Sequence, residues 1–389
     1  MAARTILYTG KGGVGKTSVA AASARALAAR GLRTLVISTD PAHSLAESLG
    51  AELGGEPSAV GPGLWGQQIS AQEELQAHWS AVRDWMGELL AERGVDRISA
   101  EELTVPPGMD ELFSLLVLRE HHAAGEFDAI VVDCAPTGET LRLLSFPDVA
   151  RWWIEKVFPF ERQLLAAARP LARTLLDIPL PDQAVFADVQ RLSEKLIAMN
   201  AILRDREHCS IRLVMNPDRM VIGEAMRTFT YLGLYGYVCD AVIVNRLFGE
   251  GVGSYFSSWR QTQEEHMALV REAFEPVPVL TAPYFEQEVL GAQMLDRLAQ
   301  SVFADVDPGA MLFSGMSQQL TVSGDGDATL RLALPLADKG RISLKKIGSE
   351  LVVSVDGQRR TISLPPAMAQ MRAGAARFED GELQIDFDA

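Results

Sequence analysis

The sequence predicts an α/β protein with a mostly parallel sheet, followed by a C-terminal antiparallel β-sandwich-like domain. The first part is predicted by apolar runs at residues 4–9 and 35–37, which flank an alanine-rich helical segment at 16–30. Strand, helix and strand in this order form the repeating unit of a parallel sheet. The second part is predicted by apolar residues that alternate with polar ones after residue 328.

Four further apolar runs fit the same parallel sheet, at residues 129–132, 212–215, 241–244 and 278–280. Continuous apolar runs are expected there because the strands of a parallel sheet are buried on both faces. Two helical insertions, at about 70–125 and 150–210, are predicted between the strands. The second is rich in large apolar side chains, which either pack against one another and the sheet or form a groove for an apolar client.

The domain organisation follows from a change in composition. Residues 306–327 are rich in Gly, Ser and Asp, which predicts a linker between a first domain of residues 1–305 and a C-terminal domain of residues 328–389. In the C-terminal domain, Asp-Gly pairs at 356–357 and 380–381 predict hairpin turns between short strands.

Charge and composition exclude several classes of function. The net charge of −15 argues against a nucleic-acid partner, because phosphate backbones repel an acidic protein. No run of about 18 apolar residues predicts a membrane span, and no signal peptide is seen, so a cytoplasmic location is expected. The three cysteines have no CxxC spacing, which predicts small buried side chains and no zinc site.

Residues 10–17, GKGGVGKT, match the phosphate-loop pattern G-x-x-x-x-G-K-[ST] between a predicted strand and a predicted helix. Glycines let backbone N–H groups approach phosphate oxygens, and the helix N-terminus adds partial positive charge. The pattern predicts ATP with Mg²⁺, with Lys16 at the β- and γ-phosphates and Thr17 as a ligand of Mg²⁺. The nucleotide-binding residues predicted in this segment are Gly12, Gly13, Val14, Gly15, Lys16, Thr17 and Ser18.

A second lysine, Lys11, lies near the start of the loop. This position is typical of deviant Walker A ATPases, in which the lysine reaches across a dimer interface to the nucleotide of the partner. Lys11 therefore predicts a homodimer and a catalytic role for this side chain, and a solvated lysine is the alternative.

Two longer motifs resemble a known family. Residues 38–44, STDPAHS, resemble switch I of the family of arsenite-pump ATPases and tail-anchored-protein targeting ATPases, and residues 133–142, DCAPTGETLR, resemble its switch II. Residues 214–246 also look like this family, and the resemblance covers about residues 1–300. It implies a dimeric P-loop NTPase fold and ATP hydrolysis.

The resemblance also implies residue roles. Asp40 would orient or deprotonate the attacking water, and Asp133 would lie near Mg²⁺ or its water shell. Asn245 would contact the adenine edge, and a loop containing Pro283 and Tyr284 would border the base. The implied switch residues are Asp40, Pro41, His43, Asp133, Pro136, Thr137 and Gly138, with Gly138 as the pivot that responds to loss of the γ-phosphate.

Departures from the family leave the specific function open. The cysteines match no metalloid motif of the arsenite pumps, and the CxxC that binds zinc across some targeting dimers is absent. Glu139 replaces a usual histidine, and Ser44 replaces an asparagine. Three hypotheses follow: an ATPase that couples nucleotide state to binding of a hydrophobic membrane-protein segment, a metalloid or anion export ATPase subunit, and a nucleotide-gated holdase with little turnover.

The C-terminal segment resembles the α-crystallin domain of small heat-shock proteins. The matching runs are residues 330–335, LRLALP, residues 351–355, LVVSV, residues 359–365, RRTISLP, and residues 378–383, FEDGEL. The alternative is a β appendage that only covers a surface or a dimer edge.

Overall fold

The computed structural model describes most of the chain outside two internal segments. The described residues are 2–38, 44–69, 109–134, 183–251, 253–315, 318–322, 327–348, 350–364, 368 and 371–388. Most of the two predicted helical insertions, at 70–108 and 135–182, therefore lies outside the described residues.

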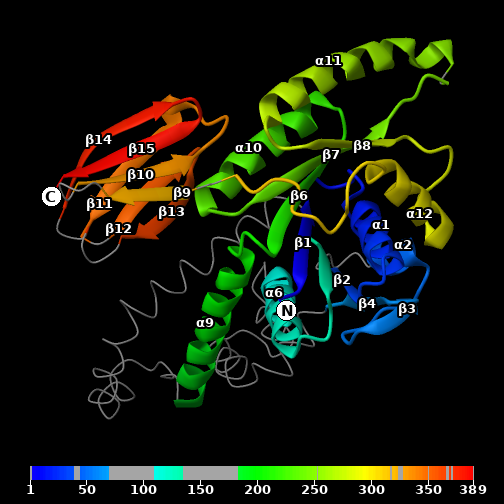
Figure 1. The fold of residues 1–389 in the computed structure, drawn as a ribbon, viewed down its shortest axis with the longest axis horizontal. Coiled ribbons are helices and arrows are strands. Elements are labelled where there is room, and N and C mark those ends of the chain that lie inside the picture. The colour runs from blue at the N-terminus through cyan, green and yellow to red at the C-terminus, as the bar shows by residue number, and fades with distance from the viewer. Residues whose placement is uncertain are drawn as a thin grey trace, which may run out of the picture.

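An eight-stranded sheet forms the centre of the first domain (Figure 1). Its strand order is β3-β4-β2-β5-β1-β6-β7-β8, and every neighbouring pair is parallel except β3 and β4. The strands are β1 (Arg4–Thr9), β2 (Thr34–Ser38), β3 (Ser58–Gly61), β4 (Leu64–Gln68), β5 (Ala129–Asp133), β6 (Cys209–Met215), β7 (Cys239–Leu247) and β8 (Val279–Pro283). All six predicted strands are confirmed, and β3 and β4 are additional.

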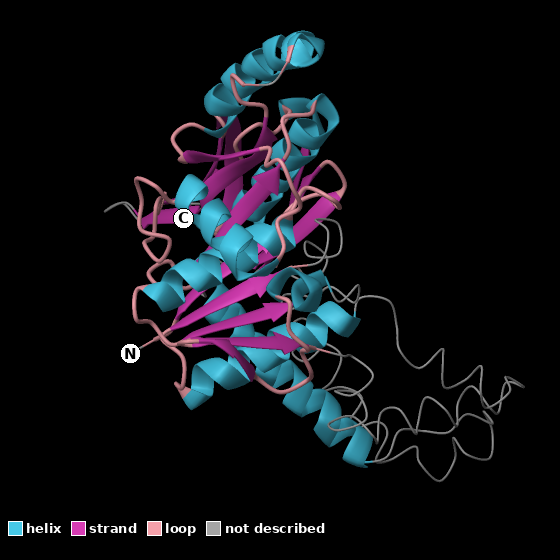
Figure 2. Ribbon diagram, turned by 90° about the vertical axis from the view of Figure 1, so that its right-hand side faces the viewer, coloured by secondary structure: helices cyan, strands magenta, loops and turns pink. Residues whose placement is uncertain are grey.

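Helices cover both faces of this sheet (Figure 2). One face packs against α1 (Lys16–Ala29), α2 (Ser44–Leu49) and α12 (Gly291–Val302). The other packs against α6 (Met109–Ala124), α9 (Gln183–Leu203), α10 (Arg219–Tyr235) and α11 (Ser257–Phe274). Leu7 of β1 belongs to the second core, and its neighbours Ile6 and Tyr8 belong to the first, because successive side chains of a strand point to opposite faces.

The C-terminal domain is made of two antiparallel sheets around its own apolar core. One sheet has the order β14-β15-β10-β9, and the other has the order β11-β12-β13. The strands are β9 (Gln318–Val322), β10 (Ala328–Ala333), β11 (Ile342–Ile347), β12 (Glu350–Val355), β13 (Gln358–Ser363), β14 (Arg372–Glu379) and β15 (Glu382–Asp388), with the 3-10 turn η3 (Lys339–Arg341) before β11. The α/β fold with an antiparallel C-terminal domain is thereby confirmed.

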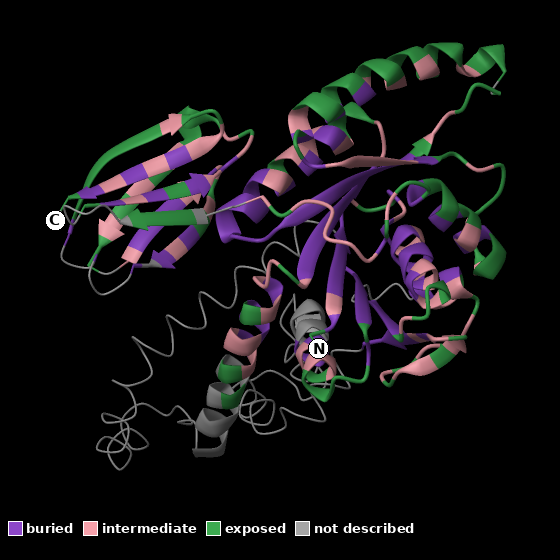
Figure 3. Cartoon of the chain, viewed as in Figure 1, coloured by how far each residue is buried: buried purple, intermediate pink, exposed green. Residues whose placement is uncertain are grey.

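Both predicted hairpin turns are present in this domain. Asp356 and Gly357, and likewise Asp380 and Gly381, have positive φ angles between 48° and 83°. Two consecutive positive φ angles are what a type I′ hairpin turn requires. The alternating apolar residues of β10, β12 and β15 are buried, as Figure 3 shows, while β14 is mostly exposed.

A buried ionic network holds the segment that follows α12. Asp240 accepts from Arg212 Nε at 3.1 Å and from Arg4 Nη2 at 3.1 Å. Both arginines also donate to backbone carbonyls of residues 308–310. Burial opposes the charge of Arg212, but Tyr8 and Asp240 more than offset this cost, and the pKa of the guanidinium is raised. The range predicted as a linker therefore begins with residues fixed to the sheet, and β9 lies near its end.

Candidate nucleotide site

The predicted phosphate loop joins β1 to α1 at the carboxyl edge of the parallel sheet. β1 ends at Thr9, residues 10–15 form the turn, and α1 begins at Lys16. Gly13 and Gly15 have φ angles of 79° and 92°, which side chains with a Cβ rarely adopt. The loop thus has the strand–turn–helix form that a phosphate site at a helix N-terminus requires.

Asn245 secures this loop from the end of β7. Its Nδ2 donates to the carbonyl oxygen of Val14 at 2.9 Å, and its Oδ1 accepts from the backbone N–H of Arg246 at 2.9 Å. A Cβ added at Gly15 would collide with the Asn245 amide. The residue that the resemblance assigned to the adenine edge therefore also determines the shape of the phosphate loop.

The two side chains predicted to meet the phosphates and the metal lie at the start of α1. Lys16 is buried, and its Nζ donates to the carbonyl oxygen of Lys11 at 3.3 Å. The hydroxyl of Thr17 lies 3.2 Å from the hydroxyl of Ser44, the first residue of α2. Ser18 follows in the same helical turn and is half-buried. The sequence placed Lys16 and Thr17 together, and the structure adds Ser44.

Asp133 ends β5, beside the strand that carries the phosphate loop. It pairs in register with Tyr8 of β1 and Ser38 of β2. Asp133 is fully buried, and its Oδ2 accepts from the Ser38 hydroxyl at 3.4 Å. Hydroxyl and carboxylate oxygens are the ligands that Mg²⁺ prefers. Thr17 and Asp133 therefore have the chemistry of Mg²⁺ ligands, and a shared ion site stays a prediction.

Aromatic residues border the same edge of the sheet beyond β7. Pro283 is the last residue of β8, and Tyr284 follows it with its backbone N–H donating to Leu247 O at 2.8 Å. The ring of Tyr284 stacks on Phe248 with a centroid distance of 5.5 Å, and Phe248 stacks in turn on Phe256 at 5.2 Å. Tyr284 is exposed, so one face of this stack is accessible to a flat ligand.

Lys11 lies on the rim of the loop. Its side chain is 39% exposed, and its Nζ is 3.7 Å from Glu224 Oε2 on α10. Six predicted switch residues, Asp40, Pro41, His43, Pro136, Thr137 and Gly138, lie outside the described residues. Of the predicted site residues, Asn245 contacts the loop, and Asp133 ends the strand beside β1. Pro283 and Tyr284 lie at the end of β8, next to the end of β7. The roles at the nucleotide and in the switches stay predictions.

Besides the contacts of Ser44 and Val14, three more contacts at this site were not expected from the sequence. They are Ser38 with Asp133, Phe248 with Tyr284, and Glu224 with Lys11. The only sequence signal for Phe248 was its place just after a strand of the parallel sheet, where ligand-binding residues commonly lie.

The comparisons with known proteins can be set against this geometry. The sequence profile described as "Anion-transporting ATPase" matches residues 3–304. The chain belongs to the anion-transporting ATPase family. It is therefore an ATPase by family, which confirms the predicted class of enzyme and the use of a nucleotide. A second profile, described as an HSP20-like domain found in ArsA, matches residues 325–387, in agreement with the small heat-shock resemblance.

Similar proteins come from bacteria and from a plant. A putative arsenical pump-driving ATPase of Chlorobaculum tepidum is 37% identical over 99% of this chain and 96% of its own length. Putative arsenical pump-driving ATPase 1 of Aquifex aeolicus is 35% identical over 98% of this chain and 99% of its own length. ATPase GET3B of Arabidopsis thaliana is 30% identical over 76% of this chain and 77% of its own length.

No described helix is long and apolar enough to cross a membrane. Within the same residues, no group of three or more His, Cys, Asp or Glu side chains is arranged to hold a metal ion.

Proposed function

We propose that this anion-transporting ATPase family member hydrolyses ATP with Mg²⁺ as a cytoplasmic homodimer, and that its nucleotide state controls binding of a hydrophobic client segment. The proposal is supported chiefly by the phosphate loop, whose two lysines differ in how far they are buried. Lys16 is buried against the loop, whereas Lys11 is half-exposed at the rim. This difference supports a role for Lys16 at the nucleotide of its own subunit and for Lys11 at that of a second subunit.

In this proposal, the residues at the sheet edge divide the work of phosphoryl transfer. Bound phosphate oxygens would replace the Lys11 carbonyl as the partner of Lys16 Nζ. Thr17 and Asp133 would hold Mg²⁺, which neutralises charge on the β- and γ-phosphates. Asp40 is the proposed group that orients the attacking water, with Lys11 of the partner stabilising the charge of the transition state.

The proposed base site uses the groups beyond β7. Asn245 has amide donors and an acceptor close to the loop, and the exposed Tyr284 ring offers a stacking surface next to Pro283. A purine bound there would lie between the polar edge of Asn245 and the aromatic face of Tyr284.

Helices α6 and α9 support the client part of the proposal. Both pack on the same face of the sheet, and they belong to the described C-terminal parts of the two predicted helical insertions. Met199 and Leu203 of α9 and Leu116 and Leu118 of α6 are buried in the same core, and the two helices are in contact. A change at the phosphate site would thus reach the insertions through strands and helices that are rigidly packed.

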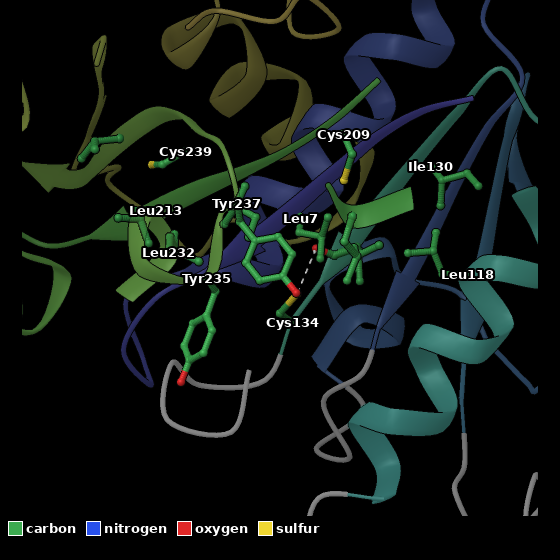
Figure 4. Close-up of a cluster of buried hydrophobic side chains, with 14 of the residues drawn as sticks. Leu7, Leu118, Ile130, Cys134, Cys209, Leu213, Leu232, Tyr235, Tyr237 and Cys239 are labelled. Carbon is green, nitrogen blue, oxygen red and sulfur yellow. Dashed lines mark hydrogen bonds between the residues drawn. The ribbon is translucent and has the colours of Figure 1, made fainter. Parts of the chain in front are cut away.

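The cysteines favour the client hypothesis over metalloid export. Cys134, Cys209 and Cys239 are all buried, and Figure 4 shows them at separate places among apolar side chains. Burial raises the pKa of Cys209 to about 12 and also raises the pKa of Cys239. The thiolate form of cysteine is the one that binds soft ions, and burial with a raised pKa keeps these groups as neutral thiols. They are therefore poorly suited to a metalloid site. The export hypothesis is supported by the names of the bacterial relatives, and arsenite-stimulated phosphate release would revive it.

A defined peptide tests the proposal. A labelled 20-residue apolar helix should bind with higher affinity in ATP than in ADP, and it should change steady-state phosphate release. A matched peptide with serine in place of half the leucines is the control. Equal binding of both peptides would refute the client. Nucleotide-dependent binding of the apolar peptide with negligible phosphate release would instead favour the holdase hypothesis.

A further inference from the structure

The half-exposed Lys11 is paired within its own subunit. Its Nζ lies 3.7 Å from Oε2 of Glu224, and the two side chains are 39% and 29% exposed. These residues come from different elements, the phosphate loop and the first turns of α10. The lysine that the proposed function sends to a partner is therefore held by a carboxylate of the same chain.

The N-terminal end of α10 is fixed with respect to the loop. α10 follows β6, and a Cβ added at Gly10 would collide with the Val214 carbonyl, so loop and strand backbones are in close contact. Ile222 of α10 is buried in the core, and His266 of α11 lies 2.6 Å from the Pro217 carbonyl through its Nδ1. Glu224 is thus presented from a rigid position.

The C-terminal end of α10 is anchored by the C-terminal domain. Leu234 is fully buried within the core of that domain. The guanidinium of the buried Arg360 donates to the Leu234 carbonyl, and the hydroxyl of Thr230 donates to the Pro335 carbonyl. A cation at the last carbonyls of a helix also complements its dipole. Neither end of α10 can move without breaking buried contacts.

The loop side of the pair is adjustable by contrast. Gly10 and Gly12 flank Lys11, and no atom lies within 4 Å of a Cβ added at Gly12. The Lys11 side chain is 39% exposed, so it can change rotamer without displacing buried groups. Glu224 is the fixed partner, and Lys11 is the one that can leave.

We propose that Glu224 is a positioning residue that retains Lys11 in its own subunit until the triphosphate of a partner competes for it. The proposal rests on the proposed function of Lys11. An exposed ion pair is weak enough to be reversible, and a triphosphate carries more negative charge than one carboxylate. The Lys11–Glu224 ion pair thus opposes association of nucleotide-free subunits, and it breaks when ATP is bound to the partner.

The size of the effect follows from the symmetry of a homodimer. Retention of one lysine by an exposed carboxylate corresponds to a factor of about 1.5 to 5. A two-fold dimer releases two lysines, so the factors multiply. Glu224→Gln, which keeps the shape and removes the charge, should lower the protein concentration for half-maximal association by about 2- to 25-fold.

The retention itself is tested without assembly or activity. Acylation of lysines in dilute, nucleotide-free protein can be followed residue by residue by mass spectrometry. In Glu224→Gln, the labelling rate of Lys11 should rise by about 1.5- to 5-fold, while that of the exposed Lys339 stays constant. Glu379→Gln in β14 is the control for the change in charge. An unchanged Lys11 rate would overturn the proposal, whatever the oligomeric state.

The consequence for assembly is tested by sedimentation with ATP in four proteins: wild type, Glu224→Gln, Lys11→Ala and the double variant. Glu224→Gln should associate at lower concentration than wild type, and the substitution should have no effect in the Lys11→Ala background. An effect that persists without Lys11 would overturn the proposal. If Lys11→Ala associated like wild type while the labelling result held, the proposed function would fail and the retention of Lys11 would stand.

Discussion

The side-chain amide of Asn245 donates a hydrogen bond of 2.9 Å to the carbonyl oxygen of Val14, across 231 positions of sequence. This contact makes the end of β7 part of the phosphate loop. The hydrogen bond requires glycine at position 15, because a Cβ there would collide with the Asn245 amide. Loop shape and base site are thus linked through one side chain.

Gly15→Ala should therefore impair nucleotide binding strongly. The substitution places a Cβ at a φ of 92° and against Asn245, so the loop must shift. We expect at least about a tenfold loss of affinity for MgATP in calorimetric titration. Gly54→Ala, at a glycine with open space and an ordinary φ, is the control. Equal affinities for the two variants would contradict the assigned role of Gly15.

Thr17→Ala should raise the Mg²⁺ concentration needed for half-maximal ATPase activity. The variant removes a hydroxyl from the predicted ion site and leaves the loop backbone in place. Thr17→Ser should restore the wild-type requirement, because it retains the oxygen. The assay is phosphate release over a Mg²⁺ titration. A wild-type Mg²⁺ requirement in Thr17→Ala would remove this residue from the site.

Two glycines of α10 should respond to alanine in opposite ways. A Cβ at Gly233 would lie 2.6 Å from the Ala333 carbonyl, so Gly233→Ala should loosen the C-terminal domain. Gly223→Ala has room, at 3.7 Å from Arg227, and should stabilise the helix by up to about 1 kcal/mol. Calorimetry and limited proteolysis after residue 305 would measure both. Similar protease sensitivity in the two variants would argue against close docking at Gly233.

Stability should fall as the pH drops below about 6.5 because of two half-buried histidines. Burial lowers the pKa of His121 and of His122 from 6.5. The folded state therefore favours the neutral rings, and His122 Nε2 forms a hydrogen bond of 2.7 Å with the Thr5 hydroxyl. As the pH falls below 6.5, the unfolded chain binds protons at these histidines before the folded chain does. The contribution of the two neutral histidines to the free energy of unfolding is therefore complete above pH 6.5, and it is lost as the pH falls through the lowered pKa values. The double variant with glutamine at both positions should show a flatter fall in Tm between pH 7.5 and 5.5.

Most of the parallel sheet could be predicted from the sequence because its strands are short continuous apolar runs. β1, β5 and β7 have this form, and they carry the phosphate loop, Asp133 and Asn245. The Asp-Gly pair at 380–381 predicted a strand before it, but the extent of β14 was not predicted. Its sequence, RAGAARFE, has no alternating apolar residues and lies almost wholly exposed at a sheet edge. A strand that buries little leaves no periodic signal.

The parts of the site that escaped prediction depend on distant packing. Glu224 is close to Lys11 because β6 lies next to β1 in the sheet, and α10, which follows β6, begins near the loop that follows β1. Phe248 meets Tyr284 because β7 and β8 end side by side. Strand order decides both contacts, and no local pattern around these residues encodes it.

Mixing two inactive variants tests the central claim most directly. Lys16→Ala cannot hold its own triphosphate, and Lys11→Ala cannot serve that of a partner, so each should be inactive alone. In a mixed dimer, the site of the Lys11→Ala subunit receives Lys11 from the other chain. An equal mixture should recover about one quarter of the wild-type specific activity, because half of the random pairs are mixed and each has one complete site. A mixture as inactive as its components, or a fully active Lys11→Ala protein, would contradict the account.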